Sequence, residues 1–288
     1  MEFEPVIIIG AGRSGTNMLR DILTSFLNFG TWPCDEINYI WRHGNARYPN
    51  DELGVDEATE SVRMFIRMSF RRIANKFGIR YVVEKTCANS LRVAFVNKVF
   101  PEAKFIFIVR DGRDVVASSM KRWRAPLDIP YILKKARYIP VIDTPYYAMQ
   151  YLARRMYRIF SKEKRVLLWG PRFEGMYEML KTKSLAEICA AQWTHCVEKA
   201  SKDFSTMESE RYFLLKYEEF VSHPRSHMQK IADFLSTRLK SEEVACSISS
   251  VTDKNVGKWQ AELDDKIIEK IMPYIKTSLE KYDYFSPK

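Results

Sequence analysis

A glycine-rich stretch near the start of the chain has residue types and spacing suited to binding phosphate. It reads Gly-Ala-Gly-Arg-Ser-Gly-Thr-Asn over residues 10–17 and directly follows a short apolar run. Such a turn between a strand and a helix exposes backbone N–H groups at the positive end of the helix, where an anion is stabilised. The loop is not a Walker A motif, because Thr16 and Asn17 follow Gly15 where Lys-Ser or Lys-Thr is required, and its cation, Arg13, lies inside the loop. The stretch therefore predicts a phosphate-binding loop that is not built for a magnesium-bound triphosphate.

A second candidate anion site follows the clearest apolar run in the chain, residues 104–109. Arg110 and Arg113 come directly after it, and Ser118 follows about one helical turn later. Open α/β sheets bind ligands beyond the carboxyl ends of their strands, so we expect Arg110 to contact an anion and Ser118 to donate its hydroxyl to the same anion. For Arg113 a structural role, in which neighbouring aspartates neutralise it, is an equal alternative.

A third group consists of Glu84, Lys85 and Thr86, at the end of the apolar run over residues 81–83. Burial at a strand end would raise the pKa of Glu84 and make it a better base near neutral pH. Lys85 would bring positive charge to a group in transfer. The alternative is a purely structural Glu–Lys pair.

The first two segments together resemble the two signature motifs of the sulfotransferase family. The matching sequences are Gly-Arg-Ser-Gly-Thr in the loop and Val-Arg-Asp-Gly-Arg-Asp-Val-Val-Ala-Ser after the later strand, about a hundred residues apart. Members of this family bind 3′-phosphoadenosine 5′-phosphosulfate (PAPS) and transfer its sulfuryl group to a hydroxyl or an amine. The resemblance covers residues 5–123 well and residues 212–260 weakly. It implies a P-loop-like α/β fold and a PAPS-dependent enzyme, and it implies no metal.

The resemblance also assigns residues to the donor. Those that would hold the 5′-phosphosulfate all lie in the glycine-rich loop: Arg13, Ser14, Gly15, Thr16 and Asn17. Arg110 and Ser118 would hold the 3′-phosphate. Tyr217 matches the tyrosine of the family's Tyr-Glu-Asp strand end, which lies near adenine. Lys258 and Trp259 belong to a stretch that resembles the family's Gly-x-Trp segment, which closes over the 3′-phosphate.

The third group resembles the Glu-Lys-[Ser/Thr] motif of glycan-type sulfotransferases, whose glutamate deprotonates the acceptor. Glu84 would then be the base, while Lys85 and Arg13 would stabilise the sulfuryl group or the leaving phosphate. The cytosolic branch of the family has a histidine directly after its Lys-Thr, where this chain has Cys87. The glutamate motif favours a carbohydrate-like or lipid-linked hydroxyl as the acceptor.

Apolar runs alternate with amphipathic segments, which is typical of a parallel sheet covered by helices on both faces. Strands are expected at residues 5–9, 81–83, 104–109 and 211–216. Helices are expected at residues 16–27, 57–77, 89–99, 114–121 and 224–235. The sequence thus predicts a single α/β domain over residues 1–288, a P-loop-like three-layer fold with a central parallel sheet. Residues 122–205 interrupt the alternation and are expected to form an inserted basic helical cap for the substrate.

The formal net charge of +10 is concentrated in one segment. Residues 121–185 contain 15 basic and 5 acidic residues, so the rest of the chain is balanced. An anionic partner is therefore expected at this segment, either an acidic acceptor or an anionic membrane surface. Most of its aromatic residues are expected to pack and its cations to face water. The expected exceptions are Trp123, Arg124 and the turn over residues 169–172.

The remaining composition narrows the class of protein. Five cysteines without a close pair favour reduced thiols in the cytoplasm, and the sequence contains neither a signal-peptide pattern nor a membrane-spanning apolar run. None of the four histidines lies at metal-ligand or triad spacing, and only His43 is placed where it could lie near the acceptor.

Two other functional classes stay open at this point. One is a P-loop kinase of small molecules, which the missing Walker lysine disfavours. The other is a basic protein that binds nucleic acid or anionic lipid through residues 121–185, for which affinity would fall steeply with salt. A PAPS-dependent enzyme implies no nucleic-acid partner.

Overall fold

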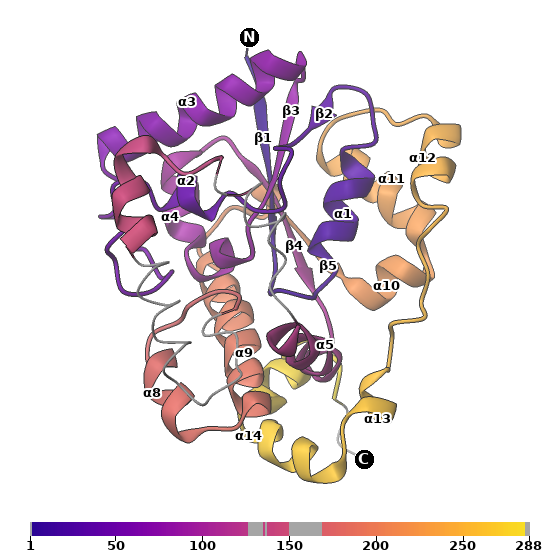
Figure 1. Cartoon of the computed structure of the whole chain (residues 1–288). Helices are drawn as coiled ribbons and strands as arrows, with labels where there is room; N and C mark the ends of the chain where they lie inside the picture. The colour runs from indigo at the N-terminus through magenta and orange to yellow at the C-terminus, as the bar shows by residue number, and fades with distance from the viewer. Residues whose placement is uncertain (1, 126–134, 136, 150–168, 286–288) are drawn as a thin grey trace.

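The computed structural model describes residues 2–125, 135, 137–149 and 169–285 (Figure 1). Its centre is a sheet of five parallel strands in the order β2-β3-β1-β4-β5. The strands are β1 (Glu4–Ile9), β2 (Phe29–Gly30), β3 (Tyr81–Lys85), β4 (Lys104–Val109) and β5 (Tyr212–Lys216). The predicted α/β class with a central parallel sheet is confirmed. Only β2 was not predicted, because a strand of two residues carries no periodic pattern.

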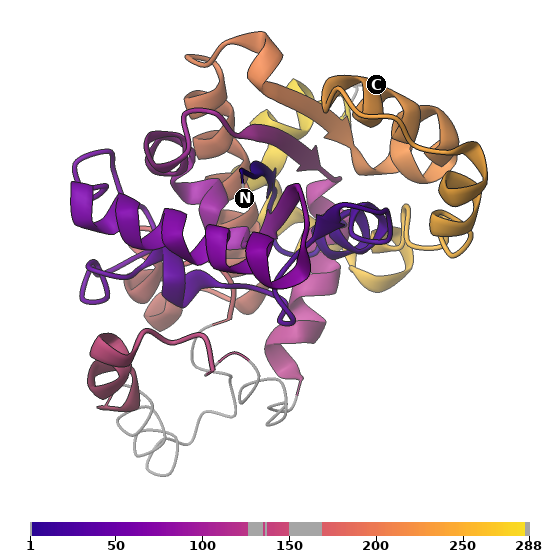
Figure 2. The ribbon, with the colours of Figure 1, turned by 90° about the horizontal axis from the view of Figure 1, so that it is seen from above.

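Helices cover both faces of the sheet, as the view along the strands shows (Figure 2). One face packs against α3 (Glu60–Phe77), α4 (Val93–Val99), α9 (Leu185–Phe204) and α14 (Asp265–Lys281). The other face packs against α1 (Thr16–Leu23), α10 (Tyr217–Ser222), α11 (Pro224–Phe234) and α12 (Ser241–Ser247). None of these described helices combines the length and the apolar composition that crossing a bilayer requires.

The alternation of side chains along a strand explains why the apolar runs are uninterrupted. In β1, Val6 and Ile8 belong to the core cluster beneath α1, whereas Ile7 and Ile9 belong to the cluster beneath α9. Successive side chains of a strand point to opposite faces, so a strand buried on both faces must be apolar at every position. All four side chains are at most 1% exposed, and burying each stabilises the fold by roughly 1.5–3 kcal/mol.

Several helix boundaries differ from those expected. Helix α1 ends at Leu23, because the chain turns back through Asn28, whose φ is +67°, to form β2. Residues 87–99 form a 3-10 helix, η1 (Cys87–Leu91), followed by α4, with the buried Arg92 between them. Helix α5 (Gly112–Arg124) starts earlier than predicted because the Asp111 side chain caps it.

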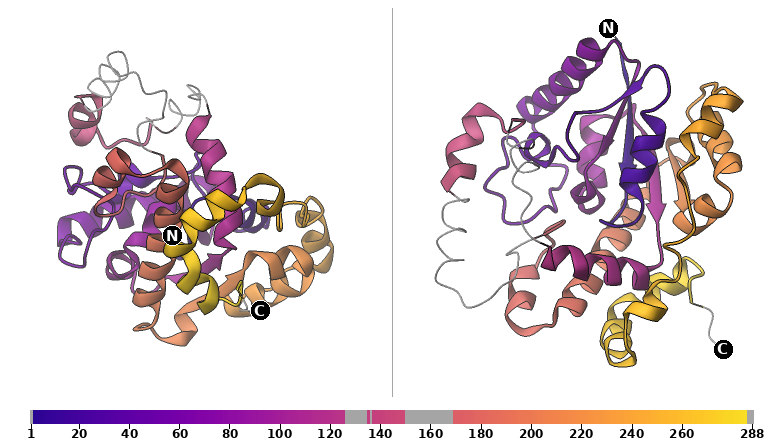
Figure 3. Two further views of the ribbon diagram at one scale, coloured as in Figure 1. Left: turned by 90° about the horizontal axis from the view of Figure 1, so that it is seen from below. Right: turned by 45° about the vertical axis from the view of Figure 1, so that its right-hand side comes forward.

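Helix α9 lies inside the range predicted as a cap but is part of the core. A capping box of Ser184 and Glu187 starts it, and its apolar face joins the main core cluster through residues such as Trp193. It packs against α5 and α14 (Figure 3). Much of the rest of the predicted cap, residues 126–134, 136 and 150–168, lies outside the described residues, so the cap stays a prediction.

The remaining short elements lie mostly around the carboxyl edge of the sheet. They are α2 (Asn38–Trp41), α8 (Met176–Thr182), α13 (Trp259–Glu262) and the 3-10 helices η2 (Val141–Asp143) and η3 (Ser209–Arg211).

Candidate functional site

The glycine-rich loop connects β1 to α1 in a conformation that only glycine allows at two positions. Gly15 is the N-cap of α1 with φ +90°, and a Cβ there would lie 2.5 Å from the Tyr217 ring. A Cβ on Gly10 would lie 2.7 Å from the carbonyl oxygen of Ile108 in β4. The loop is therefore pressed against β4 and Tyr217, with the N–H groups of the first turn of α1 at its open end.

Two buried polar atoms beside this loop have no hydrogen-bond partner among the residues that the structure describes. They are the hydroxyl of Ser14 and the Nε of Arg110. The other guanidinium nitrogens of Arg110 donate to the carbonyl of Arg13, at 3.0 Å, and to that of Asn255. An unpaired buried donor is costly, and both atoms are available to donate to an anion beside the loop, so the residues fit a phosphate or a sulfate.

Arg13 and Ser118, predicted on separate motifs, are brought together. The Nε of Arg13 donates to the Ser118 hydroxyl at 2.9 Å. Partial burial lowers the pKa of Arg13, and the nearby charges of Arg110 and Arg122 lower it further. This mutual repulsion of three guanidinium groups marks a positive potential that an anion would relieve.

The late stretch of the chain meets the same edge of the sheet. Asp114 accepts hydrogen bonds from the backbone N–H groups of Gly257, at 2.8 Å, and Trp259, at 2.9 Å, and lies 3.5 Å from the Arg110 guanidinium. The Arg110 guanidinium also stacks 4.5 Å above the centre of the Tyr217 ring. Gly257, Trp259, Arg110 and Tyr217 therefore lie close together, whereas the neighbouring Lys258 is exposed.

Arg113 has a structural environment. Its guanidinium pairs with Asp111 at 2.7 Å, donates to the carbonyl of Tyr284 at 2.9 Å and stacks 4.2 Å from the centre of the Trp259 ring. These contacts favour the structural alternative for Arg113 and leave Arg110 as the arginine with an unpaired donor.

Glu84 is almost completely buried, with 1% of the residue exposed. Its carboxylate accepts hydrogen bonds from the Thr86 hydroxyl, at 2.5 Å, and from the Asn89 side-chain amide, at 3.0 Å. Burial raises the pKa of Glu84 to about 7, although the hydrogen bond from Thr86 opposes the shift. Its neighbour Lys85 points to the opposite face of β3, as strand geometry requires.

Lys85 forms a charge cluster with residues that the sequence analysis did not select. Its Nζ lies 3.1 Å from Glu36 and 3.2 Å from Asp35, and Lys135 reaches Glu36 at 3.6 Å. Burial alone would raise the pKa of Glu36, but the ammonium groups of Lys85 and Lys135 outweigh it and lower the pKa to about 2. The sequence signal that could have identified this cluster is the adjacent pair of carboxylates, Asp35 and Glu36, in the loop that follows β2.

This cluster lies next to the glycine-rich loop. The Thr16 hydroxyl of α1 is 3.8 Å from the Cys87 thiol, and the Cys87 N–H donates to Glu36 at 3.2 Å. Arg20, one turn further along α1, pairs with Asp35 at 2.7 Å. The predicted loop residue Thr16 is thus buried beside the carboxylates, whereas Asn17 is exposed.

The aromatic and basic residues singled out after residue 121 differ in their surroundings. Trp123 is 1% exposed in the main core, so the prediction that it contacts a ligand is wrong. Arg124 is exposed. Trp169 packs against the glycine-rich loop, since a Cβ on Gly12 would lie 3.2 Å from its ring. Arg172 pairs with the buried Asp51 and is structural.

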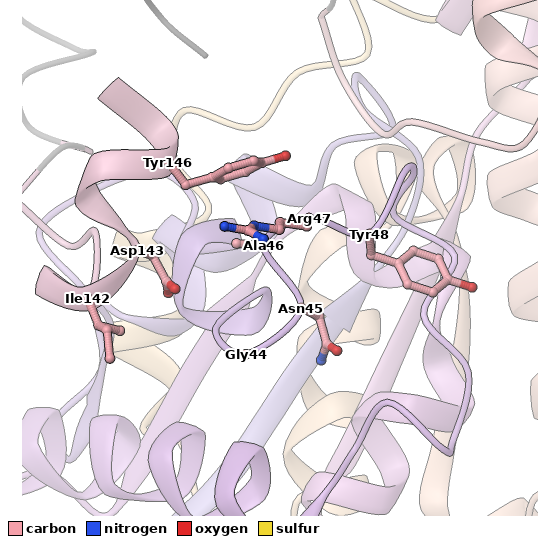
Figure 4. Close-up of a pocket in the computed structure, with 8 residues that line it drawn as sticks. All are labelled: Gly44, Asn45, Ala46, Arg47, Tyr48, Ile142, Asp143 and Tyr146. Atoms are coloured by element: carbon pink, nitrogen blue, oxygen red, sulfur yellow. The ribbon is translucent and has the colours of Figure 1, made fainter. Parts of the chain in front are cut away.

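His43 lies at the far end of α2, beside a cavity. Its Nδ1 is 2.8 Å from a carboxylate oxygen of Asp143, and its ring packs against Phe65. The cavity has a volume of about 340 Å³ and is bounded by the loop over residues 44–48 and by the segment over residues 142–146 (Figure 4). Within the described part of the chain, no three side chains of His, Cys, Asp or Glu are grouped to hold a metal ion.

Comparison with known proteins identifies similar sequences and folds. A model of the sulfotransferase family matches residues 5–167. Protein-tyrosine sulfotransferase 1 of Danio rerio is 32% identical over 133 residues, which cover 41% of this chain and 36% of that protein. The match thus spans little more than a third of that relative.

Solved structures share the fold at low sequence identity. The sulfotransferase domain from the curacin biosynthetic pathway has a TM-score of 0.55 and 13% identity, over 96% of this chain and 99% of that one. A sulfotransferase from Mycobacterium avium has a TM-score of 0.54 and 12% identity, over 100% and 78% of the two chains. A mouse sulfotransferase complexed with PAP has a TM-score of 0.50 and 14% identity, over 97% and 89%.

Proposed function

This chain belongs to the sulfotransferase family, and from that premise we propose that it transfers the sulfuryl group of PAPS to an acceptor hydroxyl. One observation carries the proposal: the buried Ser14 hydroxyl and the buried Arg110 Nε have no hydrogen-bond partner in the described part of the chain, at the point where the glycine-rich loop, α5 and residues 255–259 meet. Unpaired buried donors around a positive helix end suit an anionic ligand with two separate phosphate-like groups.

The donor would be held by the residues of these converging segments. The glycine-rich loop with Arg13 and Ser14 would bind the 5′-phosphosulfate, and Arg110 with Ser118 the 3′-phosphate. The Tyr217 ring, already stacked on Arg110, would border the adenine. When bound, PAPS supplies the sulfuryl group, and the cations Arg13 and Lys85 would stabilise the negative charge that shifts to the leaving phosphate.

The acceptor needs a base, and two carboxylates are available for this role. Glu84 is supported by its pKa of about 7, which suits proton abstraction at neutral pH, although Thr86 and Asn89 occupy its oxygens. Glu36 is supported by its contact with Lys85 and by a partly exposed side chain, but a pKa of about 2 makes it a weak base while both lysines are close. We propose Glu84 as the base, with Glu36 as its competitor.

For the acceptor we propose a carbohydrate-like hydroxyl, free or lipid-linked. The Glu-Lys-Thr motif and the carboxylates around Lys85 support this choice. The relative from Danio rerio is named for acting on protein tyrosine, which makes a phenolic hydroxyl the alternative to be tested beside it. Cytoplasmic location and contact of the basic segment with an anionic membrane stay predictions.

A thermal-shift comparison tests the proposed donor. We expect adenosine 3′,5′-bisphosphate to stabilise the protein, by about 2.7 kcal/mol at a ligand concentration of 100 Kd, because it binds only the folded state. Mg-ATP and a short oligonucleotide serve as matched anionic controls. Stabilisation by Mg-ATP alone would support a kinase, and stabilisation by the oligonucleotide alone would support nucleic-acid binding; either result would refute the proposal.

A further inference from the structure

The cavity beside His43 belongs to no part of the donor site. It lies between two chain segments that are distant in the sequence, the loop over residues 44–48 and the segment over residues 142–146. Its volume of about 340 Å³ is within the range of small-molecule sites. The lining is mixed polar and apolar: it includes Ala46, Ile142 and two tyrosine rings as well as one arginine and one carboxylate.

The loop over residues 44–48, which forms one wall of the cavity, is held in place by Arg42. The guanidinium of Arg42, 2% exposed, donates hydrogen bonds to the backbone carbonyls of four loop residues: Asn45, Ala46, Tyr48 and Asn50. The same guanidinium pairs with the buried Asp51 at 3.0 Å. A loop ordered in this way loses little conformational freedom when a ligand binds to it.

The opposite wall is attached to α2. Tyr147 packs edge-on against Tyr39 of α2, with ring centres 4.7 Å apart, and Asp143 is tied to His43 by their 2.8 Å contact. The first turn of α2 is in turn anchored at the proposed reacting centre, because the Ile37 N–H donates to the Thr86 hydroxyl at 3.2 Å. The cavity and the charge cluster around Lys85 thus lie at the two ends of one short helix, which advances about 6 Å over its four residues.

The charges in the cavity select for one kind of ligand. Arg47 is exposed, and its guanidinium makes no hydrogen bond or ion pair with a described residue. In Figure 4 its guanidinium end is turned toward the side of Asp143 and Tyr146, whereas the Tyr48 ring points the other way. Asp143, already paired with His43, is an acceptor for hydroxyl donors. One cation and one carboxylate together suit a ligand that carries both an anionic group and hydroxyl groups.

We propose that this cavity binds a carboxylate-bearing sugar unit of the acceptor, adjacent to the unit that is sulfated. Arg47 binds the sugar carboxylate, Asp143 accepts hydrogen bonds from its hydroxyls, and the Tyr146 ring lies against its C–H face. The proposal rests on the proposed sulfotransferase function and specifies its acceptor as an acidic oligosaccharide.

Calorimetric titration of the protein saturated with adenosine 3′,5′-bisphosphate tests this subsite. The probe is an oligosaccharide that alternates glucuronic acid with N-acetylglucosamine, and its control is the same oligosaccharide with the carboxyl groups reduced to alcohols. We expect the acidic probe to bind at least tenfold more tightly than the reduced one. Arg47→Gln should remove this difference, leaving the affinity for the reduced probe and for the bisphosphate unchanged.

Arg71→Gln is the matched variant, because Arg71 is an exposed arginine of α3 and its loss changes the net charge equally. It should bind both probes as the unmodified protein does. Failure of the acidic probe to bind, or equal binding by Arg47→Gln, would overturn the proposal. Binding of a tyrosine peptide rich in Asp and Glu in place of the oligosaccharide would overturn it in favour of a peptide acceptor. If the unmodified protein did not bind the bisphosphate, the donor assignment would be refuted instead. Failure of the subsite proposal and failure of the donor assignment are therefore distinguishable.

Discussion

The Nε of Arg13 donates a 2.9 Å hydrogen bond to the hydroxyl of Ser118, a residue 105 positions later in the chain. The bond joins the loop after β1 to the helix after β4. Because these strands are neighbours in a parallel sheet, their carboxyl ends open to the same edge. The two segments therefore meet at one edge of the sheet, and we expect substitutions on either side to affect the same proposed ligand.

Arg110 and Arg113 should respond differently to substitution. Arg110→Gln removes a buried guanidinium with an unpaired Nε, and we expect affinity for adenosine 3′,5′-bisphosphate to fall roughly 10- to 100-fold, since a hydrogen bond to a charged group is worth about 1.5–3 kcal/mol. Arg113→Gln should lower the melting temperature but preserve affinity, because its guanidinium is already engaged by Asp111 and by the carbonyl of Tyr284. Calorimetry of both variants measures this. Equal affinities for the two variants would contradict the assignment.

Two glycines with similar backbone angles provide a test of the loop's packing. Gly15 and Gly175 have φ of +90° and +78°, but a new Cβ meets the Tyr217 ring at 2.5 Å only at Gly15. Gly175→Ala should cost about 1 kcal/mol, the strain of a left-handed residue with a side chain. Gly15→Ala should lower the free energy of unfolding by clearly more than this and weaken bisphosphate binding. Urea denaturation measures the difference, and similar losses in the two variants would show that Tyr217 yields freely.

The pH dependence of kcat distinguishes the two candidate bases. A carboxyl with a pKa of about 7 accepts a proton only when ionised, so with Glu84 as base kcat should fall tenfold per pH unit below pH 7. Glu84→Gln should lose about 10²- to 10⁴-fold in kcat with unchanged bisphosphate affinity. A carboxyl with a pKa of about 2 stays ionised throughout pH 5–7. A flat profile over that range, with the larger loss in Glu36→Gln, would reassign the base to Glu36.

The buried Asp51 should be important for stability. It pairs with Arg42 at 3.0 Å and lies near Arg92 and Arg172, whose charges outweigh burial and lower its pKa. Asp51→Asn leaves buried guanidinium groups without a counter-charge and should cost about 3–5 kcal/mol of unfolding free energy. The exposed Asp56→Asn serves as control and should change it by less than about 0.5 kcal/mol. A small effect of Asp51→Asn in chemical denaturation would mean that solvent reaches these arginines.

The sequence predicted that the candidate donor residues would lie near one another, because they follow apolar strands of one parallel sheet. Arg13, Ser118, Arg110 and Tyr217 follow strands that hydrophobic patterning identifies, and parallel strands must bring them together. Helix ends were less accurate where side chains decided them, as Asp111 does for α5.

Neither the charge cluster around Lys85 nor the cavity could be predicted from the sequence in this way. Asp35 and Glu36 lie in an irregular loop after a strand of only two residues, and no local pattern indicates that they meet Lys85. The cavity depends on residues 44–48 meeting residues 142–146, a contact between two loops far apart in the chain. Such contacts depend on the packing of the whole fold, as does the burial of Trp123, which looks like a loop residue in the sequence.

The order of the strands separates two groups of loops along the carboxyl edge of the sheet. The loops after β1, β4 and β5 carry the proposed donor residues, whereas the loop after β2 carries both the carboxylates that meet Lys85 and one wall of the cavity. Substitutions in the stretch between β2 and α3 should therefore alter the proposed acceptor side while leaving the proposed donor residues unchanged. The loop should keep its conformation when its side chains are substituted, because Arg42 fixes it through backbone carbonyls, which every amino acid provides.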